Sequence, residues 1–344
     1  MADGGSFLVV GLPGPALGAE EREALERLRP FGVILFKRNV EESAQVLDLT
    51  EAVRAASPKT LLFVDAEGGR VDRLAGIVGA APAGAELAAA SPELALRAGR
   101  WVGHALRALG FDADFAPMVD LDRGMTGNGL EGRTLGTSPR AVIARARAFL
   151  AGLRSAGVGG CVKHFPGLGA SAEDTHHGGT RVGLSRAELA DDLAPYEALA
   201  AEAGAVMIGH AVYPALDPDG LPADLSPAIA RGVLRRDLGF DGVAFSDDLE
   251  MSALAPFGTL ADRAERAFAA GCDVIPICSR LDAAAEAAER LGRTAPARRA
   301  EVARRLTAYR DAIFATRRAI RPHRLETVRD RLARVRQEAR RALA

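Results

Sequence analysis

The sequence predicts an α/β fold: a single (β/α)8 barrel of the TIM type with a C-terminal helical extension. Eight short apolar runs, most of them rich in Val, Ile and Phe, alternate with longer segments rich in Ala, Leu, Arg and Glu. Such runs are typical of strands buried on both faces, and apolar residues three and four apart are typical of amphipathic helices. Eight strand–helix units favour a closed barrel over the alternative, an open doubly wound sheet.

The elements follow from these two patterns in chain order. The apolar runs predict strands at residues 6–12, 32–36, 60–65, 112–121, 159–165, 205–212, 242–248 and 272–279. The helical spacing predicts helices at residues 20–31, 43–57, 91–110, 138–157, 185–204, 226–239, 260–271 and 280–292. Several of these segments close on glycine, the residue that most often follows the last turn of a helix. Because no Pro- or Gly-rich linker divides the chain, we expect one domain, residues 1–344, with a C-terminal helical segment at about residues 318–344.

Composition limits the partners of this chain. The 44 Lys and Arg residues balance 45 Asp and Glu residues, so charge provides no case for nucleic acid as a partner. No run approaches the roughly 20 apolar residues that cross a bilayer, and the N-terminus lacks the basic start of a signal peptide. We therefore expect a cytoplasmic, monomeric protein with no membrane partner. The basic residues near the C-terminus predict the solvated face of a helix rather than a binding arm.

Polar residues stand where the predicted central strands end. In a barrel of this type the active site lies at the carboxyl ends of the strands. Asp65, the 114–120 region, Lys163 with His164, His210 and Asp247 all occupy such positions. A purely structural barrel would not need a charge at nearly every one of these ends, so the pattern predicts a functional site.

The stretch GVAFSDD places two carboxylates after one strand, Asp247 and then Asp248. A carboxylate on a rigid strand end that faces a pocket suits a glycosidase, as a nucleophile or as a stabiliser of an oxocarbenium-like transition state. The alternative is that one acid caps the following helix. With two acids both roles can be filled, Asp247 for chemistry and Asp248 for a cap or a supporting contact.

The stretch VKHFPGLGASAEDTHHGG carries three of the six histidines of the chain. Consecutive strand residues point to opposite faces, so Lys163 and His164 can share a ligand only where the strand ends and turns. Asp174 and His176 are two residues apart on a loop, which places their side chains on one side. A carboxylate that orients an imidazole forms a general acid/base unit.

Asp65, Glu67 and Arg133 form a third group of candidates. Asp65 ends a strand and could accept hydrogen bonds from two neighbouring sugar hydroxyls. Glu67 is either a general acid or a member of a structural ion pair. Arg133, between glycines, is either a planar fork of donors for oxygen ligands or a surface arginine. Phosphate binding is disfavoured because neither GxGxxG nor GxxxxGK[ST] occurs.

Metal chemistry is the main competing interpretation of the histidines. His164, His176, His177, His210 and Asp247 could imitate the ligands of a zinc-dependent barrel hydrolase. However, no HExxH or CxxC occurs, and no HxH stands at the first strand. The three cysteines have no paired close spacing and lie in or beside apolar runs. We therefore expect no metal site and three buried free thiols.

Taken together and in order, these motifs resemble glycoside hydrolase family 3, specifically its single-domain bacterial β-N-acetylglucosaminidases of peptidoglycan recycling. The resemblance covers about residues 32–279 and rests on GVILFKRN, VDAEGGRVDRL, FAPMVDL, GRTLG, KHFPGLG with DTH, LPADLSP, LGFDGVAFSDDLEM and AGCDVI. It implies a barrel, a retaining two-step mechanism and removal of terminal β-linked N-acetylglucosamine from muropeptide fragments. It also implies that neither a metal nor an organic cofactor is needed.

The resemblance also assigns roles to residues. It implies that Asp247 is the nucleophile and that His176, with Asp174, is the general acid/base. The sugar-binding positions of the family match residues of this chain as follows: Asp65, Arg73, Arg133, Lys163 and His164. A histidine with a reference pKa of about 6.5 can give a proton to the leaving oxygen and then take one from water.

The chain departs from the family pattern at three places. Leu168 replaces the second histidine of KHFPGHG, DTH replaces DSH, and Gly178 and Gly179 follow where members often carry bulkier residues or Pro. Three alternatives stay open. A β-glucosidase of the same family usually carries a second domain, a phosphorylase would use phosphate in place of water, and a non-catalytic sugar-binding barrel would share the fold.

Overall fold

The computed structural model describes residues 4–173, 180–321 and 323–344. Eight parallel strands form the centre, and each lies inside one of the eight predicted apolar runs. They are β1 (Leu8–Gly11), β2 (Gly32–Leu35), β3 (Leu61–Val64), β6 (Ala113–Asp114), β7 (Val162–Phe165), β8 (Ala205–Ile208), β9 (Val243–Ser246) and β10 (Ile275–Ile277). Every residue of these strands is buried, as apolar runs between two layers require.

The strands are arranged in chain order around a ring. One parallel sheet has the order β10-β1-β2-β3-β6 and a second has the order β7-β8-β9. Parallel bridges from Ala113 to Gly159 and from Met118 to Lys163 join the sheets on one side, and Phe245 to Val274 joins them on the other. This is the order of a (β/α)8 barrel, with ladders interrupted at two places. The predicted barrel fold is confirmed, and the open doubly wound sheet is wrong.

Helices follow the barrel strands at the positions that the helical spacing predicts. They are α1 (Ala19–Leu28), α2 (Ser43–Ala56), α5 (Pro92–Ala108), α6 (Pro139–Ser155), α7 (Leu189–Ala203), the π-helical segment η4 (Ala228–Asp237), α8 (Leu260–Ala270) and α9 (Leu281–Gly292). The helical spacing corresponds to a buried face: on α5, Leu94, Ala98, Val102 and Leu106 follow one another at intervals of four and are all buried. Helix α7 ends at Gly204, which adopts the left-handed conformation with φ 73°.

Shorter elements lie in the loops between strands and helices. They are η1 (Gly4–Phe7), η2 (Lys37–Asn39), the antiparallel hairpin β4 (Ala66–Gly68) and β5 (Val71–Asp72), α3 (Ala75–Val78), α4 (Gly84–Ala88), η3 (Ala223–Leu225) and η5 (Ser252–Phe257). The hairpin, α3 and α4 all lie between β3 and α5. They lengthen the chain at the carboxyl end of β3, which is where the barrel rule places function.

Phenylalanine rings fill the inside of the barrel. The ring of Phe63 stacks on Phe115 at 4.9 Å between centroids, and Phe245 meets both rings edge-on at 5.6 and 5.2 Å. Edge-to-face and offset rings at such distances add to the free energy that burial itself provides. A side chain at Gly32 would place its Cβ 2.3 Å from the Phe63 ring, so only glycine fits on this strand beside the ring.

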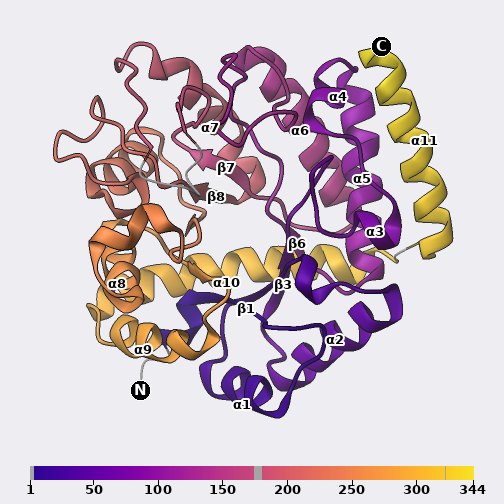
Figure 1. Ribbon diagram of the computed structural model, residues 1–344. Coiled ribbons are helices and arrows are strands. Elements are labelled where there is room, and N and C mark those ends of the chain that lie inside the picture. Colours follow the sequence, from indigo (N-terminus) through magenta and orange to yellow (C-terminus); the bar gives the residue numbers. More distant parts are fainter. Residues whose placement is uncertain (1–3, 174–179, 322) are drawn as a thin grey trace.

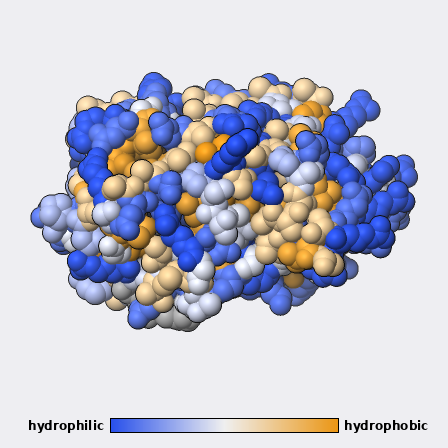
Figure 2. Space-filling view, turned by 90° about the horizontal axis from the view of Figure 1, so that it is seen from above, coloured by the Kyte–Doolittle hydropathy of each residue, from blue (hydrophilic) through white to orange (hydrophobic). Residues whose placement is uncertain are grey.

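Two C-terminal helices complete the fold. Helix α10 (Pro296–Ala319) runs across the molecule, and α11 (Leu325–Leu343) lies along its edge beside α5 (Figure 1). Helix α11 falls within the segment predicted to be helical, whereas α10 is not among the predicted helices. Val328, Leu332, Val335 and Ala339 of α11 are buried, and its arginines, except the half-buried Arg336, are exposed. Figure 2 accordingly shows hydrophilic side chains gathered at the edge of the molecule that α11 forms.

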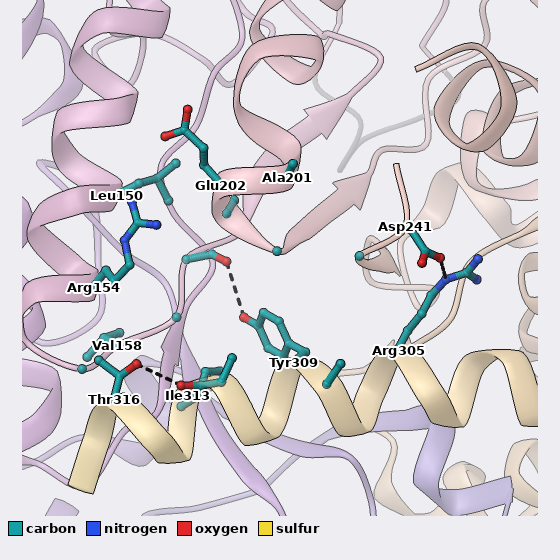
Figure 3. Close-up of a pocket in the computed structure, with 18 of the residues that line it drawn as sticks. Leu150, Arg154, Val158, Ala201, Glu202, Asp241, Arg305, Tyr309, Ile313 and Thr316 are labelled. Carbon is teal, nitrogen blue, oxygen red and sulfur yellow. Dashed lines mark hydrogen bonds and ion pairs between the residues drawn. The ribbon is translucent and has the colours of Figure 1, made fainter. Parts of the chain in front are cut away.

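Helix α10 covers the amino end of the barrel. The Tyr309 ring lies 6.3 Å from that of Phe31, just before β2, and its hydroxyl donates to the Gly160 carbonyl at 3.4 Å. A cavity of about 360 Å³ lies between α6, α7 and α10, with Leu150, Val158 and Ile313 among its walls (Figure 3). Because barrel active sites lie at the opposite end, this cavity, whose lining also includes Glu202, Asp241 and Arg305, belongs to the floor of the barrel.

Two further expectations concern the cysteines and membrane-spanning helices. Cys161, Cys272 and Cys278 are buried free thiols, as their apolar surroundings predict. Within the described residues, no helix combines the length and the apolar character needed to cross a membrane.

The contact between the Tyr309 and Phe31 rings predicts that removing it will lower stability measurably. Replacing Tyr309 by Ala removes the ring from Phe31 and should lower the free energy of unfolding by about 3 kcal/mol, which is typical of a large-to-small change in a core. Denaturant-induced unfolding followed by circular dichroism measures the loss. Leu343→Ala, at an exposed position near the end of α11, is the control and should leave the midpoint unchanged. Equal midpoints for Tyr309→Ala and wild type would contradict the anchoring of α10.

Candidate active site

A cavity of about 500 Å³ opens at the carboxyl ends of the strands. Its lining includes every predicted site residue that the structure describes: Asp65, Arg73, Arg133, Lys163, His164 and Asp247. These residues come from four different strand ends and loops, so the fold brings together groups that are up to 182 positions apart in the chain (Asp65 to Asp247). Asp174 and His176, the predicted acid/base pair, lie outside the described residues.

Asp247 follows β9 directly and is held by its backbone. Its amide donates to the Ile208 carbonyl at 2.9 Å, and its carboxylate accepts from the Asp248 amide at 2.8 Å. Burial acts to raise the pKa of Asp247, but His210, His164, the Asp248 amide and Lys163 together lower it below its ordinary value. Asp247 is therefore an ionised carboxylate that faces the cavity.

Asp248 has a supporting place beside Asp247. Its carboxylate accepts from the Glu250 amide at 3.1 Å and so begins the turn that follows β9. Burial, with repulsion from Glu250 and Asp247, raises the pKa of Asp248 to about 6. The two adjacent acids thus differ in pKa as well as in contacts, which agrees with the division of roles that the sequence predicts.

Lys163 is buried between two carboxylates. Its Nζ lies 2.8 Å from Asp65 Oδ1 and 2.7 Å from Glu67 Oε1. Burial opposes the charged form, yet Asp65 and Glu67 raise the pKa of Lys163 above its ordinary value, so the ammonium persists. Asp65 also lies 3.6 Å from the Arg73 guanidinium. These contacts leave part of the Asp65 carboxylate facing the cavity, where it can accept hydrogen bonds.

The contact between Glu67 and Arg133 decides between the alternative roles that the sequence leaves open for each residue. The Arg133 guanidinium binds the Glu67 carboxylate through two hydrogen bonds of 2.9 and 2.8 Å, and a third goes to the Gly129 carbonyl at 2.9 Å. Burial acts to raise the pKa of Glu67, but Lys163 and Arg133 hold it well below its usual range. Glu67 is a member of an ion pair and not a general acid. Arg133 is largely buried at the cavity and is not a surface arginine.

Asp120 fixes the ring of His164. The sequence does not reveal this role of Asp120. His164 Nδ1 lies 2.8 Å from Asp120 Oδ2, and the other oxygen of Asp120 accepts from the Leu168 amide at 2.7 Å. With Nδ1 committed to Asp120, Nε2 is the ring nitrogen left for a ligand. Asp120 lies in the 114–120 region that the strand-end rule selects, but its pairing with His164 depends on three-dimensional contacts.

Apolar residues complete the lining of the cavity. Ile34, Phe36, Phe115, Leu168, Met207, Met251 and Pro276 give the cavity an apolar wall. A mixture of apolar surface and a few convergent polar groups is the usual composition of a small-molecule site. His210, another strand-end residue, is buried next to Asp247 and pairs with Asp224 at 3.0 Å. The apolar residues look like core residues in a sequence, whereas the strand-end position marks His210 but does not reveal its partner Asp224.

Residues 4–173, 180–321 and 323–344 contain no cluster of three His, Cys, Asp or Glu side chains arranged to bind a metal ion. Of the histidines that suggested a metal, His164 and His210 each have an aspartate partner instead. His176 and His177 lie outside the described residues. The described groups are suited to chemistry with a carboxylate nucleophile and to holding a polar ligand, because an ionised acid faces a cavity that buried cations surround.

Comparison with known proteins gives consistent matches. Residues 6–308 match the family described as the glycosyl hydrolase family 3 N terminal domain. The chain is 42% identical over 286 residues to a β-hexosaminidase of Xanthomonas oryzae pv. oryzae, covering 79% of this chain and 83% of the relative. It is 40% identical over 282 residues to a β-hexosaminidase of Stenotrophomonas maltophilia, with the same coverage.

Solved structures agree with these relatives. NagZ from Neisseria gonorrhoeae, in complex with N-trifluoroacetyl-D-glucosamine, has a TM-score of 0.82 at 33% identity and covers 96% of this chain and 98% of its own. A glycoside hydrolase family 3 β-N-acetylglucosaminidase from Paenibacillus has a TM-score of 0.88 at 31% identity, covering 97% of this chain and 67% of its own.

The Glu67 contacts predict an acid-dependent stability effect. Glu67→Gln removes the counter-charge of Lys163 and Arg133 and should cost about 3–5 kcal/mol at neutral pH. Because the pKa of folded Glu67 is depressed, its contribution is fully present above its ordinary value of 4.5 and is lost as the pH falls below that value. The difference in unfolding free energy between wild type and Glu67→Gln should therefore shrink below about pH 4.5.

Glu289→Gln is the matched control, because Glu289 pairs with Arg293 on the solvent-exposed surface. It should change stability little at either pH. A constant difference between wild type and Glu67→Gln from neutral to acid pH would show that Glu67 has an ordinary pKa in the fold.

Proposed function

Because this chain belongs to glycoside hydrolase family 3, we propose that it is a β-N-acetylhexosaminidase that removes terminal β-linked N-acetylglucosamine from muropeptide fragments. The observation that carries the proposal is the ionised Asp247 carboxylate at the end of β9, facing a cavity edged by Lys163, His164 and Arg133. The names of the relatives, β-hexosaminidase and β-N-acetylglucosaminidase, support the choice of sugar. The muropeptide substrate rests on the sequence resemblance.

The proposed reaction proceeds in two steps with retention. Asp247 attacks the anomeric carbon, the bond from that carbon to the leaving oxygen breaks, and His176 gives its proton to the leaving oxygen. Water then attacks the glycosyl-enzyme ester after His176 takes one of its protons, and Asp247 leaves as a carboxylate. Asp174 orients the imidazole and stabilises its charged form. A histidine in this role adds no negative charge beside the anionic nucleophile.

The sugar-binding roles rest on which polar atoms face the cavity. Asp65 keeps acceptor capacity after its contact with Lys163, so it can accept from two sugar hydroxyls. His164, with Nδ1 held by Asp120, presents Nε2 to the sugar. We assign Arg73, Arg133 and Lys163 to the same binding set because they line the same cavity as cations. The apolar wall, which includes Phe36 and Met207, would cover the less polar face of the ring.

The proposal also covers domain organisation, cellular location, oligomeric state and cofactors. We propose that residues 1–344 act as one catalytic domain, in which α10 and α11 belong to the barrel that they pack against. We also propose that the protein works in the cytoplasm as a monomer, on a small carbohydrate, with no metal or organic cofactor. These properties follow from the composition and from the resemblance to the single-domain members of the family.

The nucleophile assignment predicts loss of turnover. Asp247→Ala should lower kcat for an aryl N-acetyl-β-glucosaminide by roughly 10⁴-fold or more, since the variant lacks the carboxylate that forms the proposed covalent intermediate. Release of the aryl alcohol, measured by absorbance, gives the rate. Asp282→Ala, which changes an exposed acid on α9, is the control and should leave the rate unchanged. Normal turnover by Asp247→Ala would end the assignment.

The acid assignment predicts dependence on the leaving group. His176→Ala should lower kcat/KM strongly for aryl glycosides whose phenol has a high pKa and much less for those with an acidic phenol, which need little protonation. A series of aryl N-acetyl-β-glucosaminides measures the slope for both proteins. A uniform loss across the series would contradict the acid role. In the same assay, preference for aryl β-glucosides, phosphate-dependent release of sugar 1-phosphate, or binding without turnover would identify the three alternative functions.

A further inference from the structure

His210 and Asp224 form a fully buried pair beside the strand end that carries Asp247. His210 follows β8, Asp224 lies in η3, and neither side chain has any solvent exposure. His210 Nδ1 lies 3.0 Å from Asp224 Oδ2, and His210 Nε2 lies 2.9 Å from the Asp248 carbonyl oxygen. Each ring nitrogen of His210 thus has an oxygen atom next to it.

Both neighbouring oxygens are acceptors, and this favours the charged form of the ring. A carboxylate and a carbonyl can each interact favourably only with an N–H, and a neutral imidazole has one N–H. The imidazolium has two, and it places its positive charge 3.0 Å from Asp224 as an ion pair, although no directed hydrogen bond joins Nδ1 to that carboxylate. Burial acts to lower the pKa of His210, but Asp224, Asp247 and the Asp248 carbonyl raise it to about 9. Burial raises the pKa of Asp224, and His210 opposes that shift.

The pair is connected to Asp247 through the peptide that follows it. His210 holds the Asp248 carbonyl, while the Asp248 amide donates to Asp247 Oδ1 at 2.8 Å. The Asp247 amide in turn donates to Ile208, two residues before His210. Both ends of this short loop are therefore tied to the end of β8. A change in the position of the His210 ring would move the peptide that orients the Asp247 carboxylate.

Charge connects the pair to Asp247 as well. Among the groups that lower the pKa of Asp247, His210 has the largest effect, ahead of His164, the Asp248 amide and Lys163. Asp224 faces Asp247 as a second carboxylate, and Cys272 Sγ lies 3.5 Å from the Asp224 carbonyl oxygen. Without the His210 imidazolium, the carboxylates of Asp224 and Asp247 would both be buried, and no positive charge at the end of β8 would compensate them. Asp224 alone would therefore disfavour an ionised Asp247.

We propose that His210 and Asp224 are a positioning pair, in which Asp224 keeps His210 as an imidazolium and His210 keeps Asp247 ionised and correctly oriented. This inference rests on the proposed role of Asp247 as the nucleophile. Within the described residues neither member of the pair lines the cavity, so neither touches the sugar. The pair acts on the reaction only through Asp247 and the Asp248 peptide.

The decisive readout is the acid limb of the pH profile. The profile of kcat/KM reports the ionisation of the free enzyme, and its acid limb should follow Asp247. In His210→Gln the cation is lost, and in Asp224→Asn burial drives the unpaired imidazole to its neutral form. His210→Gln should move the acid limb upward by about one pH unit or more, the size expected when a neighbouring opposite charge is removed. Asp224→Asn should move it upward by less, because this variant also removes the negative charge of Asp224. KM should change little, while kcat falls about ten- to a hundredfold through misplacement.

The matched control is His104→Gln. His104 is another buried histidine, but it lies on α5 against Trp101 and His323, away from the cavity. It should leave the acid limb in place. A double variant, His210→Gln with Asp224→Asn, should lose no more activity than the more impaired single variant, because the two residues act as one unit. Additive losses, or acid limbs that coincide with wild type in both single variants, would overturn the proposal.

Two further measurements do not depend on turnover. Nitrogen NMR of ring-labelled histidine should show two protonated ring nitrogens for His210 at neutral pH, with the signal assigned by its loss in His210→Gln. The raised pKa of His210 also means that the pair stabilises the fold fully below the ordinary value of 6.5 and loses this effect as the pH rises through about 9. The difference in unfolding free energy between wild type and Asp224→Asn should therefore shrink between these values.

These experiments distinguish a failure of the positioning pair from a failure of the nucleophile assignment. If Asp247→Ala retains turnover, the assigned nucleophile is wrong whatever the His210 variants do. If Asp247→Ala is inactive but His210 is a neutral ring by NMR, the positioning pair is wrong and the nucleophile stands. If His210→Gln fails to fold, Asp224→Asn, which preserves the shape of the side chain, and the NMR measurement on the wild type still decide the question.

Discussion

The buried Lys163 ammonium is the interaction on which the geometry of the cavity depends. It comes from β7 and binds Asp65 after β3 and Glu67 on β4, so one cation ties together two sides of the barrel mouth. Glu67 extends this connection to Arg133 in the loop after β6. Removing a charge from water is costly, and the opposite charges of these groups compensate one another. The same contacts that stabilise the mouth therefore also place its ligand-binding atoms.

The two ends of the barrel use their charged groups differently. At the amino end, α10 closes the floor with apolar side chains such as Ile313 and with arginines that are paired with buried acids: Arg298 and Arg305 contact Asp273, and Arg317 contacts Asp112. At the carboxyl end, polar and charged groups follow the strands and meet around an open cavity. Between them the stacked rings of Phe63 and Phe115 form a layer that separates the two. A rigid apolar support beneath the charged groups is what allows their distances to be maintained.

Local patterns in the sequence were sufficient for the barrel and for most of the described site. Apolar runs predict all eight central strands because each strand is buried on both faces. Strand-end positions identify Asp65, Lys163, His164 and Asp247, since parallel strands bring their carboxyl ends to one place. The pattern does not predict α10, whose contacts are with residues far away in the chain, such as Phe31. Asp174 and His176 lie outside the described residues, so their roles remain those that the motif implies.

Sequence patterns do not show which acid contacts which histidine or arginine. Asp120 and Asp224 are acids within ordinary strand-end or loop segments, and only the fold shows that each faces a histidine. Glu67 illustrates the same limit: its position beside a Gly-Gly turn favours an ion pair but leaves a general acid open. The structure decides between them because Arg133, 66 positions later, contacts its carboxylate.

Leu168 shows how a departure from a motif can leave the site intact. It stands where the family pattern has a second histidine, yet its own contribution to the polar network is made by the backbone. The Leu168 amide donates to Asp120, which holds His164, and its side chain is buried among apolar neighbours. A side chain at this position therefore needs only to fill space while the peptide keeps its direction. On this reasoning the orientation of His164 depends on Asp120 and on the course of the chain through residues 164–168, and not on a second imidazole.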